Sequence, residues 1–258
     1  CIRDRSEAFT PKDAKQLKTW FSKLLTWILN SPQGQEEARQ ANNHSTAHDA
    51  QVIAFAMYAG NMKVAREVIN AIPRKRLFTQ IEPDGKQPHE LRRTLAFGYS
   101  QFNLSHFIDI FMMARKIGIS IDNATSEDGR SFYKAMDFLV PYVGKDVKAW
   151  PYQQISEWKY KQQEFCKDLY RTFLLNPERK DYLKLYKTHR IIDWKDRFNL
   201  LWMEADDVNN AYAFACGQLQ FAMQCAAKAR KEADNQCKHR VIPRSSNKDG
   251  SLRMIHPH

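Results

Sequence analysis

The sequence is poor in the residues that interrupt regular structure. It has 9 glycines and 10 prolines among 258 residues, which excludes collagen-like and low-complexity chains. It also has no apolar run near the ~18 residues that a membrane-spanning helix needs, so we expect no membrane partner. The opening Cys-Ile-Arg-Asp-Arg does not have the pattern of a signal peptide.

Cysteine is scarce and irregularly placed. The five thiols are odd in number, widely spaced and without a Cys-x-x-Cys pair: Cys1, Cys166, Cys216, Cys225 and Cys237. Structural zinc sites and disulfide frameworks depend on regular spacings, so we expect inert thiols. The scattered histidines and carboxylates form no compelling ligand set, and we predict neither a metal nor a cofactor.

Charge of one sign predominates. The chain has 40 Lys and Arg against 29 Asp and Glu, a net charge of +11, which favours an anionic partner. Nucleic acid is not expected, because no helix-turn-helix or aromatic-basic motif accompanies the charge. Acidic lipid and an acidic polysaccharide are the other anionic partners, and the charge does not choose between them. Part of the excess is explained equally well as a solvated outer face, as at Lys159, Lys161, Lys167 and Arg171.

Apolar residues recur at spacings of three and four, which is typical of amphipathic helices. Very few segments alternate with period two, so the sequence predicts an all-α fold. Helical hairpins stack into a solenoid or a closed (α/α) toroid, and the lack of a fixed repeat favours the toroid. The expected helices cover residues 13–30, 47–59, 62–71, 89–116, 129–142, 155–175, 179–187 and 205–234.

Composition changes near residue 235. The segment that follows is rich in Pro, Ser, Asn and Gly, as is usual for linkers. We therefore predict one domain over residues 1–236, then a linker and the start of a second domain over residues 237–258.

The run NNHSTAHD at residues 42–49 precedes an apolar helix. Simple capping explains part of it, with Ser45 or Thr46 as the N-cap and Asp49 in the first turn. Capping leaves Asn42, Asn43 and His44 unexplained. Such donors before a helix N-terminus form a pocket that binds carboxylates readily.

Two further runs are rich in polar and aromatic residues. In residues 80–100, a continuous helix would place Arg93, Phe97 and Ser100 on one face with Tyr99 beside it; an ordinary amphipathic helix with solvated arginines and a core tyrosine is the alternative. In residues 150–155, WPYQQI, aromatics beside amides suit sugar stacking, but a loop anchored by a buried tryptophan fits as well.

These runs together resemble the alginate-lyase-like polysaccharide lyases. Residues 42–49 resemble their NNHGTxYD signature, residues 80–88 (QIEPDGKQP) resemble their QIEPDGxQP stretch, and residues 93–104 and the Trp150 run resemble later segments. The resemblance covers about residues 10–200, and the nearest branch is polysaccharide lyase family thirty-eight, glucuronan and alginate lyases. Two positions depart from the pattern: Ser45 replaces Gly, and His48 replaces Tyr.

The resemblance implies an (α/α) toroid that is incomplete at the N-terminus, because only about forty residues precede the first motif. It implies β-elimination on a 1,4-linked polyuronate, either alginate, including polymannuronate, or glucuronan. Asn43, His44 and Arg93 would neutralise the uronate carboxylate, and Tyr99 would act as base and acid, with His44 as the alternative base. The candidate substrate-binding residues are Asn42, His48, Gln80, Gln87, Trp150, Tyr152 and Gln153.

Other interpretations remain open. An inactive carbohydrate-binding or scaffold toroid would share the same motifs. Residues 241–244 and 249–254 resemble the opening of unsaturated glucuronyl hydrolases, which implies a fused hydrolase domain beyond residue 258. The family resemblance also implies a periplasmic or secreted location, where such polysaccharides occur.

Overall fold

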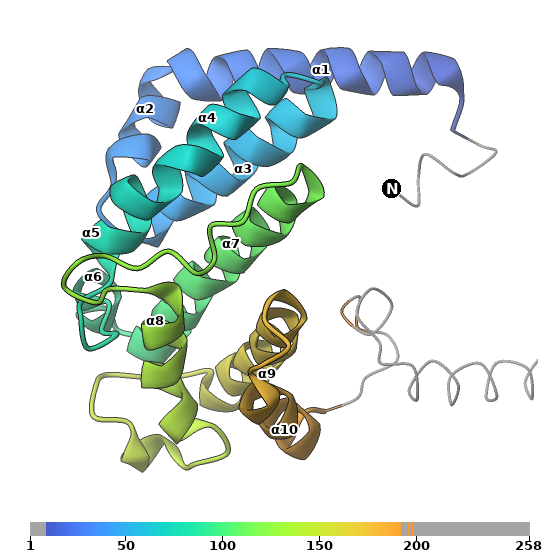
Figure 1. Cartoon of the computed structure of the whole chain (residues 1–258). Coiled ribbons are helices and arrows are strands. Elements are labelled where there is room, and N and C mark those ends of the chain that lie inside the picture. Colours follow the sequence, from blue (N-terminus) through green and yellow to red (C-terminus); the bar gives the residue numbers. More distant parts are fainter. Residues whose placement is uncertain (1–8, 192–195, 197, 199–258) are drawn as a thin grey trace, which may run out of the picture. The chain divides into compact units, whose positions relative to one another are not determined.

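The structure is a computed structural model and describes residues 9–191, 196 and 198. Regular secondary structure in these residues is helical (Figure 1), apart from two isolated β-bridges. The all-α prediction is therefore confirmed for this part of the chain. None of its helices combines the length and apolarity needed to cross a membrane. The expected helix at 205–234 and the boundary at 236 lie outside the described residues.

The chain divides into two compact units, Cys1–Asp193 and Trp194–His258. The helices of the first unit, with short π and 3-10 segments marked η, are α1 (Pro11–Asn30), α2 (Pro32–Arg39), α3 (Asn43–Ala59), α4 (Met62–Ile72), η2 (Pro73–Leu77), α5 (Phe78–Gln80), α6 (Pro88–Leu91), α7 (Ala96–Lys116), α8 (Phe132–Leu139), η3 (Val140–Tyr142), η4 (Val147–Ala149), α9 (Trp158–Leu175) and α10 (Lys180–His189).

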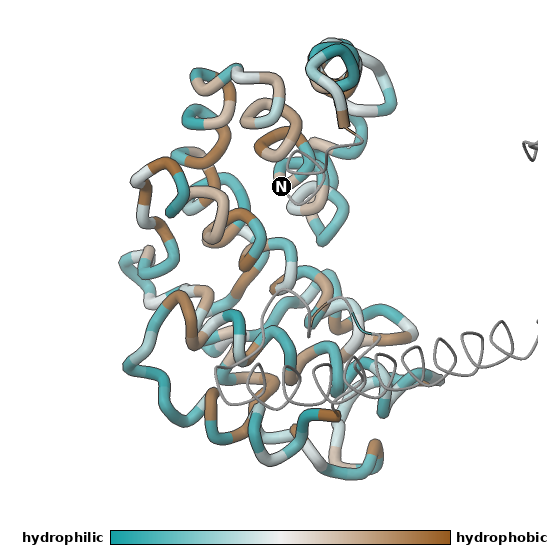
Figure 2. The backbone as a smooth tube through the Cα atoms, turned by 90° about the vertical axis from the view of Figure 1, so that its right-hand side faces the viewer, coloured by the Kyte–Doolittle hydropathy of each residue, from teal (hydrophilic) through white to brown (hydrophobic). Residues whose placement is uncertain are grey.

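Helices α3 and α7 lie at the centre of this unit. α3 packs against α1, α2, α4 and α7, while α7 packs against α8 and α9, and α9 pairs with α10. Val52 and Ile53 of α3 and Phe107 and Phe111 of α7 are almost fully buried. Hydrophobic and hydrophilic stretches alternate along the helices (Figure 2), as amphipathic packing requires. The ends of α3 and α7 are thereby held close to each other.

The end of the helix expected over residues 13–30 is also the start of another helix. Ser31 ends α1, and its hydroxyl accepts a hydrogen bond from the Gly34 N–H to cap α2. Pro32 occupies the first turn of α2, where its missing N–H costs nothing. The short helix α2, absent from the sequence prediction, covers the start of α3.

The N-cap of α3 is Asn42, so the prediction of Ser45 or Thr46 as the cap is wrong. The Asn42 side chain accepts a hydrogen bond from the His44 N–H at 3.2 Å. Ser45 and Thr46 are fully buried inside the first turns instead. Burial of both hydroxyls requires partners. Both bond to the Gln80 side chain, far away in the sequence, and Ser45 also donates to the nearby Asn42 carbonyl at 3.1 Å.

The continuous helix expected over residues 89–116 is broken between α6 and α7. Leu95 forms an isolated bridge with Gln154, and the Gln154 side-chain oxygen accepts hydrogen bonds from the N–H groups of Phe97 and Gly98. These contacts satisfy the first donors of α7, which a longer helix would have bonded internally. Arg93 therefore lies in the connection between two helices and does not share a helical face with Phe97.

The QIEPDG run ends in a tight turn. Gly85 has φ +86°, and a Cβ there would lie 2.1 Å from the backbone oxygen of Lys134. Only glycine fits this backbone conformation and this approach. The turn thus packs directly against α8, which is shorter than the helix predicted at 129–142.

Candidate active site

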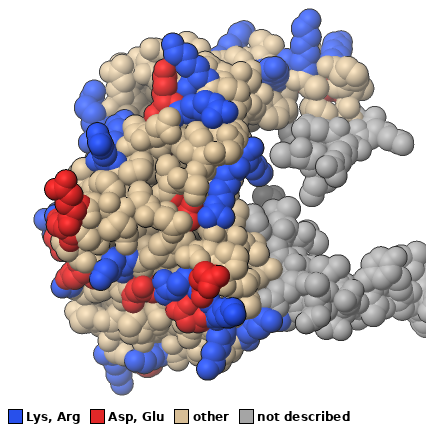
Figure 3. All heavy atoms as spheres, in the orientation of Figure 1, with Lys and Arg blue, Asp and Glu red and all other residues tan. Residues whose placement is uncertain are grey.

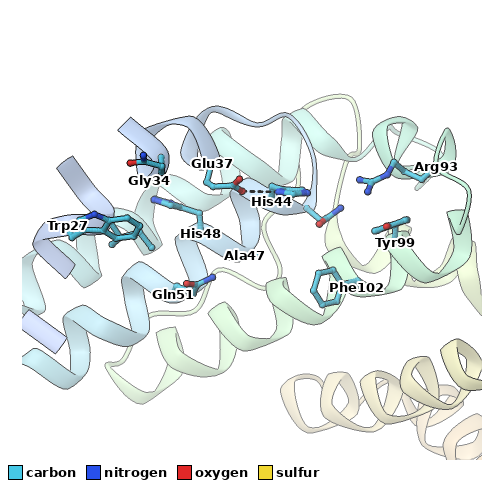
Figure 4. A pocket seen from close by; sticks show the side chains of 13 residues that line it. Trp27, Gly34, Glu37, His44, Ala47, His48, Gln51, Arg93, Tyr99 and Phe102 are labelled. Carbon is cyan, nitrogen blue, oxygen red and sulfur yellow. Dashed lines mark hydrogen bonds and ion pairs between the residues drawn. The ribbon is translucent and has the colours of Figure 1, made fainter. Parts of the chain in front are cut away.

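A cavity of about 450 Å³ opens between the ends of α1, α2, α3 and α7 (Figure 4). We call it the active-site cavity. All four predicted catalytic residues lie on its wall: Asn43, His44, Arg93 and Tyr99. The other lining residues are Trp27, Ile28, Gln33, Gly34, Glu37, Ala47, His48, Gln51 and Phe102. Residues from two separate motifs, 42–49 and 93–104, thus meet around one space.

His44 is held by a carboxylate from α2. Its Nδ1 lies 2.8 Å from Oε2 of Glu37, and both side chains are about half exposed (47% and 49%). The contact occupies one ring nitrogen and leaves Nε2 available to a ligand. Glu37 was not predicted, because α2 itself was not expected.

Asn43 is held by a buried carboxylate. Glu90 of α6 accepts hydrogen bonds from the Asn43 backbone N–H at 2.6 Å and from its side-chain Nδ2 at 2.7 Å. Burial raises the pKa of the Glu90 carboxyl above its ordinary value, against the two bonds from Asn43 and the charges of Arg93 and His44. One Nδ2 hydrogen of Asn43 is thus engaged by Glu90, and the other remains for a ligand.

Arg93 lies over the aromatic face of Tyr99. The guanidinium carbon is 3.7 Å from the ring centroid, a close cation–π contact. Stacking fixes the plane of the guanidinium while leaving its N–H edges able to bind a carboxylate. A cation thus lies directly against the face of the Tyr99 ring.

His48 lies on the wall of the active-site cavity, as expected for a substrate-binding residue. It is 7% exposed, and its Nδ1 is 3.1 Å from Oδ1 of Asp49. Burial raises the pKa of Asp49, but the contacts with His48 and with Arg76 at 2.7 Å outweigh it and hold this pKa below its usual range. His48 Nε2 has no hydrogen-bond partner among the described residues, so a buried polar atom is left for a ligand.

Gln80 and Gln87 lie behind the wall of the active-site cavity and are not among its lining residues. They are 4% and 2% exposed. Gln80 Oε1 accepts hydrogen bonds from Thr46 at 3.0 Å and from Asn103 at 2.9 Å. Gln87 Oε1 accepts a second bond from Asn103, at 2.8 Å. This glutamine network ties the start of α3 to α7. Gln80 and Gln87 therefore support the site from within, as Asn42 does by capping α3.

The loop that contains Trp150, Tyr152 and Gln153 does not line the active-site cavity. Trp150 is 5% exposed and packs edge-on against Tyr142 and Phe97, with Tyr152 tilted beside it. The Gln153 carbonyl accepts a hydrogen bond from the Ala96 N–H. The interpretation of Trp150 as a loop anchor fits this geometry, and the loop positions the first turn of α7.

Two exposed aromatic rings on the cavity wall were not predicted. Trp27 is 53% exposed and Phe102 is 42% exposed. No sequence signal marked Trp27, because it follows Trp20 by seven residues and so fits the apolar spacing of its helix. Exposed aromatic rings suit the apolar faces of sugars.

Thiol and metal chemistry receive little support from the described residues. Burial raises the pKa of the Cys166 thiol to about 12, which makes it a poor nucleophile. The other four cysteines lie outside the described residues. No group of three or more His, Cys, Asp or Glu residues in the described part is placed to hold a metal ion.

Basic side chains are spread over the visible face in Figure 3 and not gathered in one field, so charge alone does not mark the site.

Comparison with known proteins gives a family match over the part of the chain that contains the active-site cavity. Residues 2–150 match the family described as alginate lyase. The crystal structure of an alginate lyase from Bacteroides ovatus shares 46% sequence identity and a TM-score of 0.75, over 79% of this chain and 53% of that chain. The chain thus spans about half the length of this solved relative. A search among curated proteins gave no match. Because the family match covers more than half of its residues, the chain belongs to the alginate lyase family.

Proposed function

We propose that this chain carries the catalytic wall of a polysaccharide lyase that cleaves a 1,4-linked polyuronate by β-elimination. The observation that carries the proposal is the meeting of Asn43, His44, Arg93 and Tyr99 around one cavity in a member of the alginate lyase family. The substrate would be alginate, including polymannuronate, or glucuronan, and the product would carry a 4,5-unsaturated uronate end.

The first requirement of the reaction is to neutralise the uronate carboxylate. Removal of the C5 proton sends negative charge onto oxygens that are already ionised. Asn43 offers an amide N–H, His44 an imidazole nitrogen and Arg93 a guanidinium edge, and each is held by another group of the site. Donors fixed before the reaction stabilise such charge, and each typically contributes ~3–4 kcal/mol.

The second requirement is a proton transfer. The Tyr99 phenolate would take the C5 proton; the C5–H electrons form the C4=C5 double bond, and the C4–O4 bond breaks. The phenol then returns the proton to O4 of the leaving sugar. In mannuronate and glucuronate the C5 proton and O4 lie on the same side of the ring, so one tyrosine serves both steps. The reaction balances without a redox group.

His44 is the alternative base, suited to a uronate of the opposite C5 geometry. Its contact with Glu37 would keep the ring oriented for that role. Among the predicted binding residues, His48 is the one that lines this cavity, and its buried Nε2 has no hydrogen-bond partner among the described residues, which supports a role in binding a sugar hydroxyl.

The finer assignments rest on the sequence resemblance. We propose that the helices form part of an (α/α) toroid, that the chain is nearest to polysaccharide lyase family thirty-eight, and that it acts in the periplasm or outside the cell. The hydrolase-like segments at 241–254 lie outside the described residues and support a fused hydrolase only by that resemblance.

The test is to incubate the protein with glucuronan, polymannuronate and polyguluronate and to follow ultraviolet absorbance. A new conjugated double bond absorbs, so rising absorbance supports the lyase. The second candidate is an inactive carbohydrate-binding module, in which the same cavity wall binds the polymer without cleaving it. Tight binding of a polymer without new absorbance would establish that candidate and overturn the lyase.

A further inference from the structure

A second cavity, of about 270 Å³, lies on the other side of Tyr99. Tyr99 and Phe102 line both this cavity and the active-site cavity, so the two spaces are neighbours. Its remaining wall consists of Leu95 and Gly98 near the start of α7, and Glu157 and Lys161 at the start of α9. We call it the Lys161 cavity. None of its residues beyond Tyr99 has a place in the proposed chemistry.

The sequence context of Lys161 suggested a solvated outer face, but the structure places this residue elsewhere. Its side chain is 20% exposed, and its stem lies across Gly98. A Cβ at position 98 would lie 3.1 Å from Cγ of Lys161, tighter than an ordinary contact. The glycine therefore makes room for the lysine stem, which carries the ammonium group into the second cavity.

The Lys161 ammonium retains capacity for an anion. Its closest carboxylate oxygen is Oε2 of Glu157 at 3.7 Å, longer than a hydrogen bond. Within the part of the chain that the structure describes, no hydrogen bond to the Lys161 ammonium is found. The ammonium also lies over the Tyr160 ring, 5.1 Å from its centroid, a contact that uses none of its three donors in a hydrogen bond. A largely buried cation with its N–H donors unspent is suited to bind a carboxylate.

The backbone that positions Lys161 is strained. Glu157 has φ 60°, and no other non-glycine residue among those described has a positive φ. Its carbonyl accepts the first hydrogen bond of α9, from the Lys161 N–H at 2.9 Å. Strain of this kind persists only where the surroundings impose it, and it concentrates at functional sites.

We propose that the Lys161 cavity is a binding site for the uronate on the leaving-group side of the cleaved bond, with Lys161 paired to its carboxylate. The inference rests on the proposed function. If Tyr99 delivers a proton to O4 while the reacting uronate lies in the active-site cavity, the sugar attached to O4 must pass Tyr99. The space that Tyr99 also lines is the Lys161 cavity.

The chemistry of the wall selects an acidic sugar. Phe102, which is 42% exposed and shared by both cavities, offers an apolar ring surface to a sugar face. Lys161 offers a point charge, which a neutral hexose would not use. A polymer in which each sugar carries a carboxylate would engage the cationic groups of both cavities at once.

The experiment compares Lys161→Met with the matched control Lys159→Met. Both changes remove one charge from α9, but Lys159 is exposed and lines neither cavity. On the polymer that the wild type cleaves, we expect Lys161→Met to raise KM about 5–10-fold with kcat within about twofold, as for loss of uniform binding. Lys161→Arg should restore most of the affinity. Equal KM values for Lys161→Met and Lys159→Met would overturn the inference while leaving the lyase intact.

A second measurement tests the side of the bond. The unsaturated product has no sugar beyond its C4=C5 end, so it cannot fill the Lys161 cavity when it occupies the active-site cavity. Its inhibition constant should be the same in wild type and Lys161→Met, and a parallel rise would contradict the assignment. If the wild type cleaves no polymer, the proposed function fails. Calorimetric binding of a uronate tetramer then decides the subsite alone: weaker binding by Lys161→Met than by Lys159→Met supports it, and equal binding removes it.

Discussion

The Glu90 carboxylate accepts two hydrogen bonds from Asn43, one from the backbone N–H at 2.6 Å and one from the side-chain amide at 2.7 Å. This pair joins α6 to the first residue of α3. It fixes both the start of the helix and the rotamer of the amide that faces the cavity. A residue that never touches the substrate thus sets the direction in which Asn43 donates.

The Glu90→Gln variant tests this relationship. Glutamine keeps the size of the side chain but brings its own N–H donors toward the two donors of Asn43. We expect kcat to fall about 10–100-fold through misorientation of Asn43, with a smaller change in KM. The exposed Glu127→Gln serves as the control. Unchanged kcat in a folded Glu90→Gln protein would show that the orientation of Asn43 does not matter.

Tyr99→Phe removes only the phenol oxygen. Turnover should fall at least ~10³-fold, because the same oxygen takes the C5 proton and returns it to O4. Binding of the polymer should stay within about twofold, since the ring and its stacking with Arg93 remain. Initial rates and calorimetric affinity measure the two effects, with the exposed Tyr160→Phe as control. A near-normal rate would transfer the base role to His44.

Arg93→Lys keeps the charge but loses the planar fork and the stacking on Tyr99. We expect kcat/KM to fall about 10–100-fold, because an ammonium cannot hold a carboxylate at two points in a fixed plane. Arg92→Lys is the matched control, since Arg92 is the exposed neighbour in the same connection. If both variants lose activity equally, the effect belongs to the connection and not to the guanidinium of Arg93.

The buried Asp168 carboxyl makes the stability of the folded protein depend on pH. Burial raises its pKa to about 7, although Arg171 and Gln101 both contact it. A carboxyl whose folded pKa exceeds the unfolded value favours folding below the unfolded pKa. That stability is lost as pH rises through about 7.

We therefore expect the free energy of unfolding to decrease by ~2–4 kcal/mol between pH 4 and pH 8 on account of Asp168. In Asp168→Asn this part of the decrease should be missing, while Gln101 keeps an oxygen to bond. Urea unfolding at several pH values measures the difference, with the exposed Glu178→Gln as control. Parallel curves for wild type and Asp168→Asn would show that Asp168 titrates normally.

The sequence was sufficient for the helical class and for part of the cavity wall: Asn43, His44, His48, Arg93 and Tyr99. Periodicity locates α1, α4 and α10 closely, because their apolar stripes face one core. It fails between α6 and α7, where the break depends on Gln154, about sixty residues away. No local pattern carries that information.

The same reason explains the misplaced binding residues. Amides such as Gln80 and Gln87 look alike in a sequence whether they bind a sugar or one another. Only the fold shows that their partners are Thr46 and Asn103. Glu37 and Glu90 were missed for a related cause, since a carboxylate that orients a catalytic group has no signature of its own.

The glutamine network determines how the two helices that carry the site, α3 and α7, are placed relative to each other. Asn43 and Tyr99 stand on different helices, and directional amide bonds through Asn103 set the offset between those helices. A buried network of hydrogen bonds specifies one arrangement more narrowly than apolar packing alone. The distance between the Asn43 amide and the Tyr99 phenol therefore depends on buried side chains that do not line the cavity. A change at Asn103 would alter this distance and slow the proposed reaction, although every residue of the cavity wall would be unchanged.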